Sequence, residues 1–339
     1  MAVNLTTGKK KGLESVSDGR GVIAALAIDQ RTALRKLFAK ASGFSADEIP
    51  FEWLVRFKEI VSERLTPYAS AILLDPESGI SAAGRRSENA GLLLAYEQSG
   101  YEKIVPGRMP RLLEGFSAAR LKGYGADAVK VLLYYSPFSS VEINSRKQDW
   151  VERVGEECRD VDVAFFLEIV SYHDEMDEKG PEFARLKPEV VERSADEFCK
   201  PRYAVDVLKL GVPVNMKFVE SSHLPVSQAI YSRSEAIGHF RRASQATTLP
   251  FIYLSEGVSN EVFVDALALA AEAGSDFSGV LCGRATWQDG VPIFVKRGAE
   301  ALEEWLASEG VRNIKNINRH LGTARPWHER IKAPVSGKG

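Results

Sequence analysis

Eight short apolar runs recur along the chain, separated by longer stretches in which apolar residues recur every three or four positions. The runs are too continuous for strands with one solvent-exposed face, so they predict parallel strands covered on both sides. They span residues 22–29, 71–75, 91–97, 128–135, 164–170, 207–210, 251–257 and 279–285. The intervening stretches predict amphipathic helices, such as those over 51–65 and 260–273, the second capped by Asn260.

Eight strand-then-helix units predict a (β/α)8 TIM barrel. Such a barrel usually needs ~250 residues, so the 339 residues here also provide for terminal helices. The rival fold, a doubly wound sheet, needs a G-x-G-x-x-G turn after its first strand, whereas Asp29-Gln30-Arg31 stands there. We therefore expect an N-terminal tail over 1–18, one barrel domain over 19–327 and a C-terminal tail over 328–339. We expect a loop over 174–180 and a frayed end over 336–339.

Composition and charge exclude several classes of protein. With 45% apolar and 27% charged residues the chain is neither disordered nor collagen-like. Its net charge of −2 gives no positive field for nucleic acid or a membrane surface, so we expect neither partner. The lysine run at Lys9, Lys10 and Lys11 is predicted to be a solvated tail. We expect reduced, buried thiols in a cytoplasmic protein; the cysteines are Cys158, Cys199 and Cys282.

Charged residues inside or at the end of the apolar runs are the most informative feature. A buried ionised group costs several kcal/mol unless it is paired, and the carboxyl ends of parallel barrel strands carry the catalytic groups. Lys130 lies early in its run. The charges that lie late in a run or at its end are Asp29, Asp75, Glu168, Lys209 and Arg284.

Each of these charges also has a structural interpretation. Lys209 can extend its ammonium to solvent, and Lys130 with Glu168 can form a structural ion pair. Asp29 and Asp75 can cap the helices that follow them. Their convergence on one mouth nevertheless favours a site for a polar, anionic substrate.

The set fits Schiff-base chemistry. A lysine among apolar neighbours and beside a second ammonium loses its proton more easily, which frees the amine to attack a carbonyl. The resulting iminium allows a nearby carbon–carbon bond to break when a carboxylate removes a hydroxyl proton. Glu168 precedes Lys209 by one strand and is placed for this step. The five histidines show no HxxxH or HxH pair at a strand end, so we expect no metal and no other cofactor.

The last two strand ends predict a phosphate site. Ser255-Glu256-Gly257 ends the seventh run and Cys282-Gly283-Arg284 ends the eighth. Loops at these positions often bind phosphate through backbone N–H groups. Arg284 adds a forked set of donors.

Sequence blocks at every predicted strand resemble the class I tagatose-1,6-bisphosphate aldolases. The likeness runs from about Gly19 to Trp327 and implies reversible cleavage of D-tagatose 1,6-bisphosphate to dihydroxyacetone phosphate and glyceraldehyde 3-phosphate. The blocks are LAIDQR (26–31), LLDPESG (73–79), RSENAGLLLAYEQSGY (86–101), AVKVLLYY (128–135), FFLEIV (165–170), VDVLKLGVPVNMKFVE (205–220), FIYLSEGVS (251–259) and GVLCGRATW (279–287).

The resemblance implies a role for each site residue. Lys209 would form the Schiff base and Glu168 would be the general acid/base. Lys130 would polarise the substrate and keep the amine of Lys209 reactive. Asp29 and Gln30 would contact the substrate. The residues that would hold the dihydroxyacetone-phosphate end are Ser255, Gly257, Gly283 and Arg284.

Three features leave alternatives open. Glu256 stands where the family carries alanine, and its carboxylate would oppose phosphate binding unless it faces away. The segment 136–139 replaces acidic residues and would shape the distal end of the substrate. Lys217 is a rival lysine, expected beyond the barrel wall.

Related aldolases cleave 6-deoxy-6-sulfofructose 1-phosphate, so the distal anion is a phosphate or a sulfonate. A non-catalytic sugar-phosphate sensor remains an alternative. So does an isomerase or epimerase that uses Glu168 without a covalent lysine. In every case the expected partner is a small sugar phosphate, and we expect the chain to form a homo-oligomer.

Overall fold

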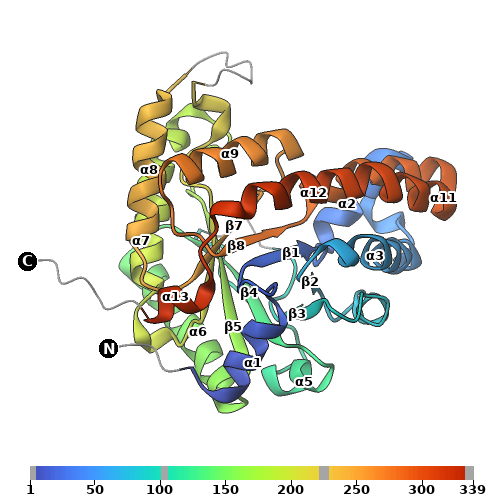
Figure 1. The fold of residues 1–339 in the computed structure, drawn as a ribbon, viewed down its shortest axis with the longest axis horizontal. Coiled ribbons are helices and arrows are strands. Elements are labelled where there is room, and N and C mark those ends of the chain that lie inside the picture. Colours follow the sequence, from blue (N-terminus) through green and yellow to red (C-terminus); the bar gives the residue numbers. More distant parts are fainter. Residues whose placement is uncertain (1–4, 101–105, 221–228, 333–339) are drawn as a thin grey trace, which may run out of the picture.

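The chain folds into a closed barrel of eight parallel strands (Figure 1). The structure is a computed structural model, and it describes residues 5–100, 106–220 and 229–332. The strands pair in sequence order, and β1 also pairs with β8. Each predicted run contains one strand, so the predicted (β/α)8 barrel is confirmed. The strands are β1 (Ile23–Ala27), β2 (Ala71–Leu74), β3 (Gly91–Ala95), β4 (Ala128–Tyr135), β5 (Ala164–Ser171), β6 (Val207–Gly211), β7 (Phe251–Leu254) and β8 (Gly279–Cys282).

Helices follow the strands and form the outer wall of the barrel (Figure 1). The helices predicted over 51–65 and 260–273 are α3 and α9, and the loop predicted over 174–180 separates β5 from α7. The helices are α1 (Thr7–Ser15), α2 (Thr32–Ser42), α3 (Phe51–Leu65), α4 (Ile80–Ala83), α5 (Ala118–Gly123), α6 (Val141–Asp160), α7 (Pro181–Phe198), α8 (Arg233–Gln245), α9 (Asn260–Glu272), α10 (Arg284–Trp287), α11 (Val291–Trp305), α12 (Val311–Arg319) and α13 (Trp327–Lys332).

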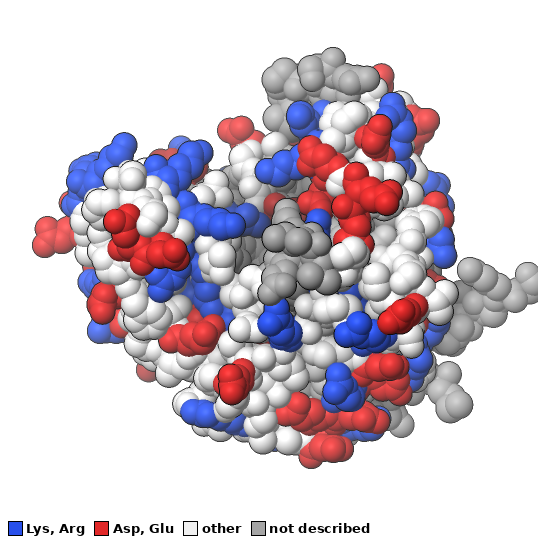
Figure 2. Space-filling view, turned by 180° about the vertical axis from the view of Figure 1, so that it is seen from behind, with Lys and Arg blue, Asp and Glu red and all other residues white. Residues whose placement is uncertain are grey.

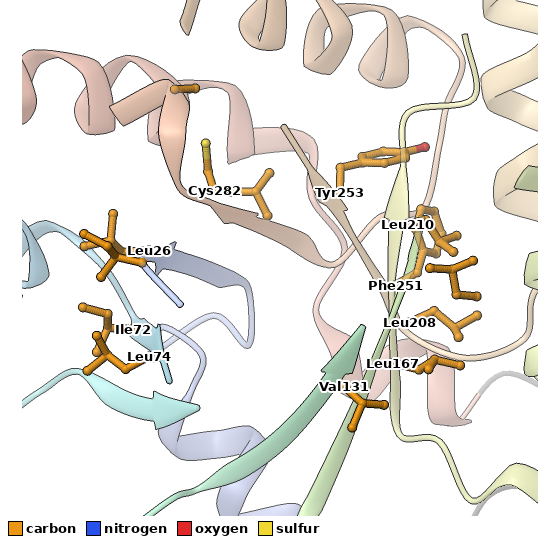
Figure 3. Packing of buried hydrophobic residues seen from close by; sticks show 14 of the residues in the cluster. Leu26, Ile72, Leu74, Val131, Leu167, Leu208, Leu210, Phe251, Tyr253 and Cys282 are labelled. Carbon is orange, nitrogen blue, oxygen red and sulfur yellow. The ribbon is translucent and has the colours of Figure 1, made fainter. Parts of the chain in front are cut away.

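Side chains along each strand alternate between two apolar layers. One layer fills the barrel, where it includes Ala71, Leu93, Phe166 and Val207. The other packs beneath the helices, and Figure 3 shows its members Leu26, Ile72, Leu74, Val131, Leu167, Leu208, Leu210, Phe251, Tyr253 and Cys282. Both faces of every strand are therefore buried, which explains the continuous apolar runs in the sequence.

The N-terminal segment is built into the barrel, so the prediction of a solvated lysine tail is wrong for Lys9. Helix α1 packs against β3, β4 and β5, and Leu13 joins the apolar layer inside the barrel. The ammonium of Lys9 lies 2.8 Å from the carboxylate of Asp206, and both side chains are buried. A buried charge needs such a partner, whereas Lys10 and Lys11 are exposed.

Other predicted ends also differ. Ser259 rather than Asn260 caps α9, because its hydroxyl accepts a hydrogen bond from the backbone N–H of Val262. The amide of Asn260 instead donates to a backbone carbonyl of α12. Residues 327–332, mostly assigned to a tail, form α13, while 336–339 lie outside the described residues.

The thiols of Cys158 and Cys282 are buried, as predicted, whereas Cys199 is only half-buried. None of the helices in the described part of the chain is long and apolar enough to cross a membrane. Figure 2 shows cationic and anionic side chains interspersed over one face of the molecule, which agrees with the net charge of −2.

The ion pair of Lys9 predicts an unusually large loss of stability for a residue so close to the N-terminus. Lys9→Ala leaves the carboxylate of Asp206 buried without its cation, which lowers the free energy of unfolding by about 3 kcal/mol. Lys10→Ala removes a neighbouring exposed lysine and changes the free energy of unfolding by less than about 0.5 kcal/mol. Urea unfolding followed by circular dichroism measures both, and equal losses would contradict the structural role of Lys9.

Candidate active site

Three adjacent strands carry charges into the barrel lumen. In β4, β5 and β6 the apolar residues Ala128, Phe166 and Val207 point into the barrel. Because side chains alternate along a strand, the residues two positions later also point inward. These residues are Lys130, Glu168 and Lys209.

Glu168 joins the two lysines. Glu168 and Lys209 are register partners in β5 and β6, and a carboxylate oxygen of Glu168 lies 2.8 Å from the Nζ of Lys209. The same oxygen lies 2.8 Å from the Nζ of Lys130. All three residues are buried. The site therefore places one carboxylate between two amines inside an apolar wall.

Lys130 is surrounded by carboxylates. Its Nζ lies 2.8 Å from an oxygen of each of Asp29, Glu97 and Glu168. Burial alone would lower the pKa of Lys130, but the three carboxylates raise it well above its usual range. Lys130 is thus a fixed positive charge at the centre of the site.

The charge of Lys130 also acts on Glu168. Burial favours the protonated form of this carboxyl group, yet Lys130 and Lys209 hold the pKa of Glu168 below its usual range. Glu168 is therefore ionised and able to accept a proton.

Glu97 belongs to this cluster but was not singled out in the sequence. It closes the third apolar run just as Asp29 closes the first, which is the signal that identifies it. Its backbone carbonyl accepts a hydrogen bond of 2.8 Å from Arg31. Burial raises the pKa of Glu97, although Lys130 and Arg31 oppose that rise.

Asp29 lies beside Lys130, and Gln30 contacts Asp29. The side-chain amide of Gln30 donates to Asp29 over 3.1 Å. The amide oxygen of Gln30 is buried and has no hydrogen-bond partner among the described residues. Such a buried acceptor fits a substrate hydroxyl. Despite burial, Lys130 and Lys209 hold the pKa of Asp29 far below its usual range.

Asp75 does not belong to this cluster. Its carboxylate pairs with Lys58 of α3 and accepts a hydrogen bond of 2.8 Å from the backbone N–H of Ser78. Asp75 and Lys58 are both fully buried. Asp75 holds the β2–α4 turn but caps no helix, because α4 starts after Gly79 without a side-chain cap. Helix α2 also lacks a side-chain cap, so the capping interpretation is wrong for both Asp75 and Asp29.

The two predicted phosphate loops meet at Arg284. Gly257 has a φ of +79°, and a Cβ at this position would lie 2.4 Å from the guanidinium carbon of Arg284. Gly283 approaches β1 so closely that its Cβ would lie 2.5 Å from the backbone oxygen of Ala27. Ser255 is buried at the end of β7. These residues form a narrow seat around one cationic fork.

Glu256 turns away from Arg284. Its carboxylate pairs with the ammonium of Lys187 in α7. It also packs over Gly211, where a Cβ would lie 2.4 Å from a Glu256 oxygen. Lys187 therefore offsets the negative charge that would otherwise oppose an anion in this loop.

Two other predicted features lie at the periphery. Lys217, the rival lysine, is exposed and contacts the ring of Phe218. In segment 136–139 the ring of Phe138 is exposed, whereas Ser136 is buried and its carbonyl accepts a hydrogen bond from Asn144.

Comparison with solved structures supports the fold. A fructose-bisphosphate aldolase from Plasmodium falciparum superposes with a TM-score of 0.68 at 15% identity, covering 95% of this chain and 97% of that one. A Schiff-base-forming fructose-1,6-bisphosphate aldolase superposes with a TM-score of 0.54 at 14% identity, covering 92% and 99%. At these identities the likeness concerns the barrel.

Sequence comparison is more specific. A protein of Enterococcus faecalis named tagatose 1,6-diphosphate aldolase 2 is 49% identical over 332 residues, covering 97% of this chain and 98% of that protein. A tagatose 1,6-diphosphate aldolase of Listeria innocua is 48% identical over 327 residues, covering 96% and 95%. The model of the DeoC/LacD family aldolases matches residues 23–289. The chain therefore belongs to the DeoC/LacD family of aldolases.

Proposed function

We propose that this protein is a Schiff-base aldolase that reversibly cleaves D-tagatose 1,6-bisphosphate to dihydroxyacetone phosphate and glyceraldehyde 3-phosphate. The observation that carries this proposal is the Glu168 carboxylate, 2.8 Å from the buried amine of Lys209 and 2.8 Å from the fixed cation Lys130. Relatives about half identical over nearly the full length carry the name of this activity.

The reaction begins with attack of the Lys209 amine on the ketone carbon, C2. Glu168 first takes a proton from the Lys209 ammonium and later returns it to the departing hydroxyl of the carbinolamine. Water leaves, and an iminium forms between Lys209 and C2. The first of these transfers crosses the 2.8 Å between Lys209 and Glu168.

Cleavage uses the same carboxylate. Glu168 removes the proton of the C4 hydroxyl, the C3–C4 bond breaks, and its electron pair moves toward the iminium to give an enamine. Glyceraldehyde 3-phosphate departs with the new carbonyl at C4. Proton return from Glu168 to C3 regenerates the iminium, and water then releases dihydroxyacetone phosphate.

Lys130 and the loop residues bind and orient the substrate. The ammonium of Lys130 stabilises negative charge that develops on substrate oxygens. Asp29 and Gln30 contact the hydroxyl groups of the substrate. The phosphate of the dihydroxyacetone end lies on Arg284, Ser255 and the backbone of Gly257 and Gly283.

The alternatives make different predictions. An isomerase or epimerase needs no covalent lysine, and a sensor binds sugar phosphates without turnover. Relative cleavage rates on tagatose, fructose and sulfofructose phosphates separate a phosphate from a sulfonate at the distal end. Cytoplasmic location and a homo-oligomeric assembly stay predictions.

Trapping tests the covalent step. Incubation with dihydroxyacetone phosphate and borohydride adds the mass of the reduced adduct to the peptide that carries Lys209, as measured by mass spectrometry. Lys209→Met abolishes both adduct and turnover, because the amine is lost. Lys217→Met removes an exposed lysine and retains both. Full activity in Lys209→Met would exclude the mechanism.

Replacement of the shared carboxylate tests the proton transfers. Glu168→Gln keeps the shape of the side chain but accepts no proton, so kcat falls about 10²- to 10⁴-fold. The trapped adduct still forms during long incubation. Glu189→Gln, on the exposed surface of α7, is the matched control and keeps wild-type kcat. An unchanged kcat in Glu168→Gln would assign the proton transfers to another group.

Because Gly257 lies against the guanidinium of Arg284, replacing it tests whether Arg284 binds the substrate phosphate. In Gly257→Ala the added Cβ displaces the guanidinium, and we expect KM for the bisphosphate to rise about 10-fold, the effect of one charge-assisted hydrogen bond. Gly43→Ala is the control, because Gly43 has a similar φ of +83° with no atom within 4 Å of its Cβ position. Similar KM values in both variants would show that Arg284 does not bind the phosphate.

A further inference from the structure

A second arginine lies at the barrel mouth, over β4 and β5. The guanidinium of Arg108 lies 5.0 Å from the ring centre of Tyr134 and 4.7 Å from that of Tyr172. The two rings meet edge to face at 6.0 Å. Arg108 is buried, although the residue lies in the long connection between β3 and α5. The structure thus holds a cation where the connections after three strands meet.

The backbone around Arg108 is held in a costly conformation. Arg108 has a φ of +42°, which costs a residue with a side chain about 1–2 kcal/mol. The preceding Gly107 has a φ of +94°, and its N–H donates to the carboxylate of Asp174 over 3.2 Å. Strain of this kind concentrates at ligand clamps and active sites.

The rings beneath Arg108 are fixed from behind. Lys147 of α6 donates to the carbonyl of Tyr134 over 2.7 Å and to the hydroxyl of Tyr172 over 2.9 Å. The same hydroxyl lies 3.1 Å from the hydroxyl of Ser139. Ser139 belongs to segment 136–139, so this segment shapes the mouth through Tyr172.

Tyr134 connects this cation to the reacting groups. It lies on the inward face of β4, four positions after Lys130. Burial raises the pKa of Tyr134, and Arg108 opposes that rise. Glu168 also raises this pKa and Arg284 lowers it. The hydroxyl is therefore within electrostatic reach of both arginines and of the catalytic carboxylate.

The order of strands sets the direction of the substrate. Lys209 is on β6, with Arg284 after β8 on one side and Arg108 over β4 and β5 on the other. A linear ketose held at C2 by Lys209, with its first phosphate at Arg284, directs its far end toward Arg108.

We propose that Arg108, with Tyr134, binds the second phosphate of the ketose bisphosphate, and that Glu178 is its counter-ion until the substrate arrives. The guanidinium pairs with the carboxylate of Glu178, whose side chain is 30% exposed and lies in the β5–α7 loop. A phosphate dianion offers more charge and more acceptor oxygens than one carboxylate. This inference rests on the proposed aldolase function.

The test compares tagatose 1,6-bisphosphate with tagatose 1-phosphate, which lacks the second phosphate. In Arg108→Gln the ratio of kcat/KM for the bisphosphate to that for the monophosphate falls about 10- to 100-fold, mainly through KM, because a charge-assisted hydrogen bond is lost. Arg108→Lys keeps the charge without the planar stacking and gives an intermediate ratio.

Glu178→Gln separates binding from a merely structural link between the two loops. It breaks the same ion pair yet leaves Arg108 available for phosphate, so the ratio stays at the wild-type value or rises. An equal fall of the ratio in Glu178→Gln and Arg108→Gln would overturn the proposal. So would equal losses on both substrates in Arg108→Gln.

The same measurements distinguish an error in the proposed aldolase function from an error in the role of Arg108. If the wild-type enzyme cleaves neither ketose and gives no borohydride adduct with dihydroxyacetone phosphate, the aldolase function itself is wrong. If it cleaves both and Arg108→Gln keeps the wild-type ratio, only the assignment of Arg108 is wrong. Adduct formation with dihydroxyacetone phosphate in Arg108→Gln verifies that this variant folds.

Discussion

The ammonium of Lys130, held by three carboxylates inside an apolar barrel, is the interaction on which the site depends. Asp29 and Glu97 follow β1 and β3, and Glu168 lies within β5; a carboxylate buried in this environment is costly without a cation. Removal of that cation would leave Asp29, Glu97 and Glu168 to repel one another at short range. One fixed charge therefore helps to keep Glu168 ionised and within reach of Lys209, with which it exchanges a proton in the proposed reaction.

The order of strands around the barrel determines where each charged group lies relative to Lys209. Its strands place Lys209, the proposed Schiff-base lysine, on β6 between two cationic regions, one around Arg284 and one around Arg108. The apolar layer that fills the barrel lies below the charges. In the proposed binding mode, phosphate groups at both ends orient a flexible ketose before its reacting carbon reaches Lys209.

The strand pattern and the charges within β4, β5 and β6 were predictable because both depend on local spacing. Contacts across the lumen were not. Glu97 and Arg31 enter the site only through barrel closure, and Asp75 leaves it because Lys58 approaches from the outer wall. A scan of single runs treats all strand-end carboxylates alike. Whether a carboxylate belongs to the site or to the outer wall depends on the cation that the tertiary structure places beside it.

The ion pair that anchors α1 also constrains the order of folding. Lys9 and Asp206 are 197 residues apart in the sequence, so most of the barrel has to be synthesised before the first helix finds its electrostatic partner. Contacts of such long sequence separation slow folding because the chain entropy is lost before the contact forms. During synthesis α1 therefore emerges long before the residue that pairs with its buried lysine.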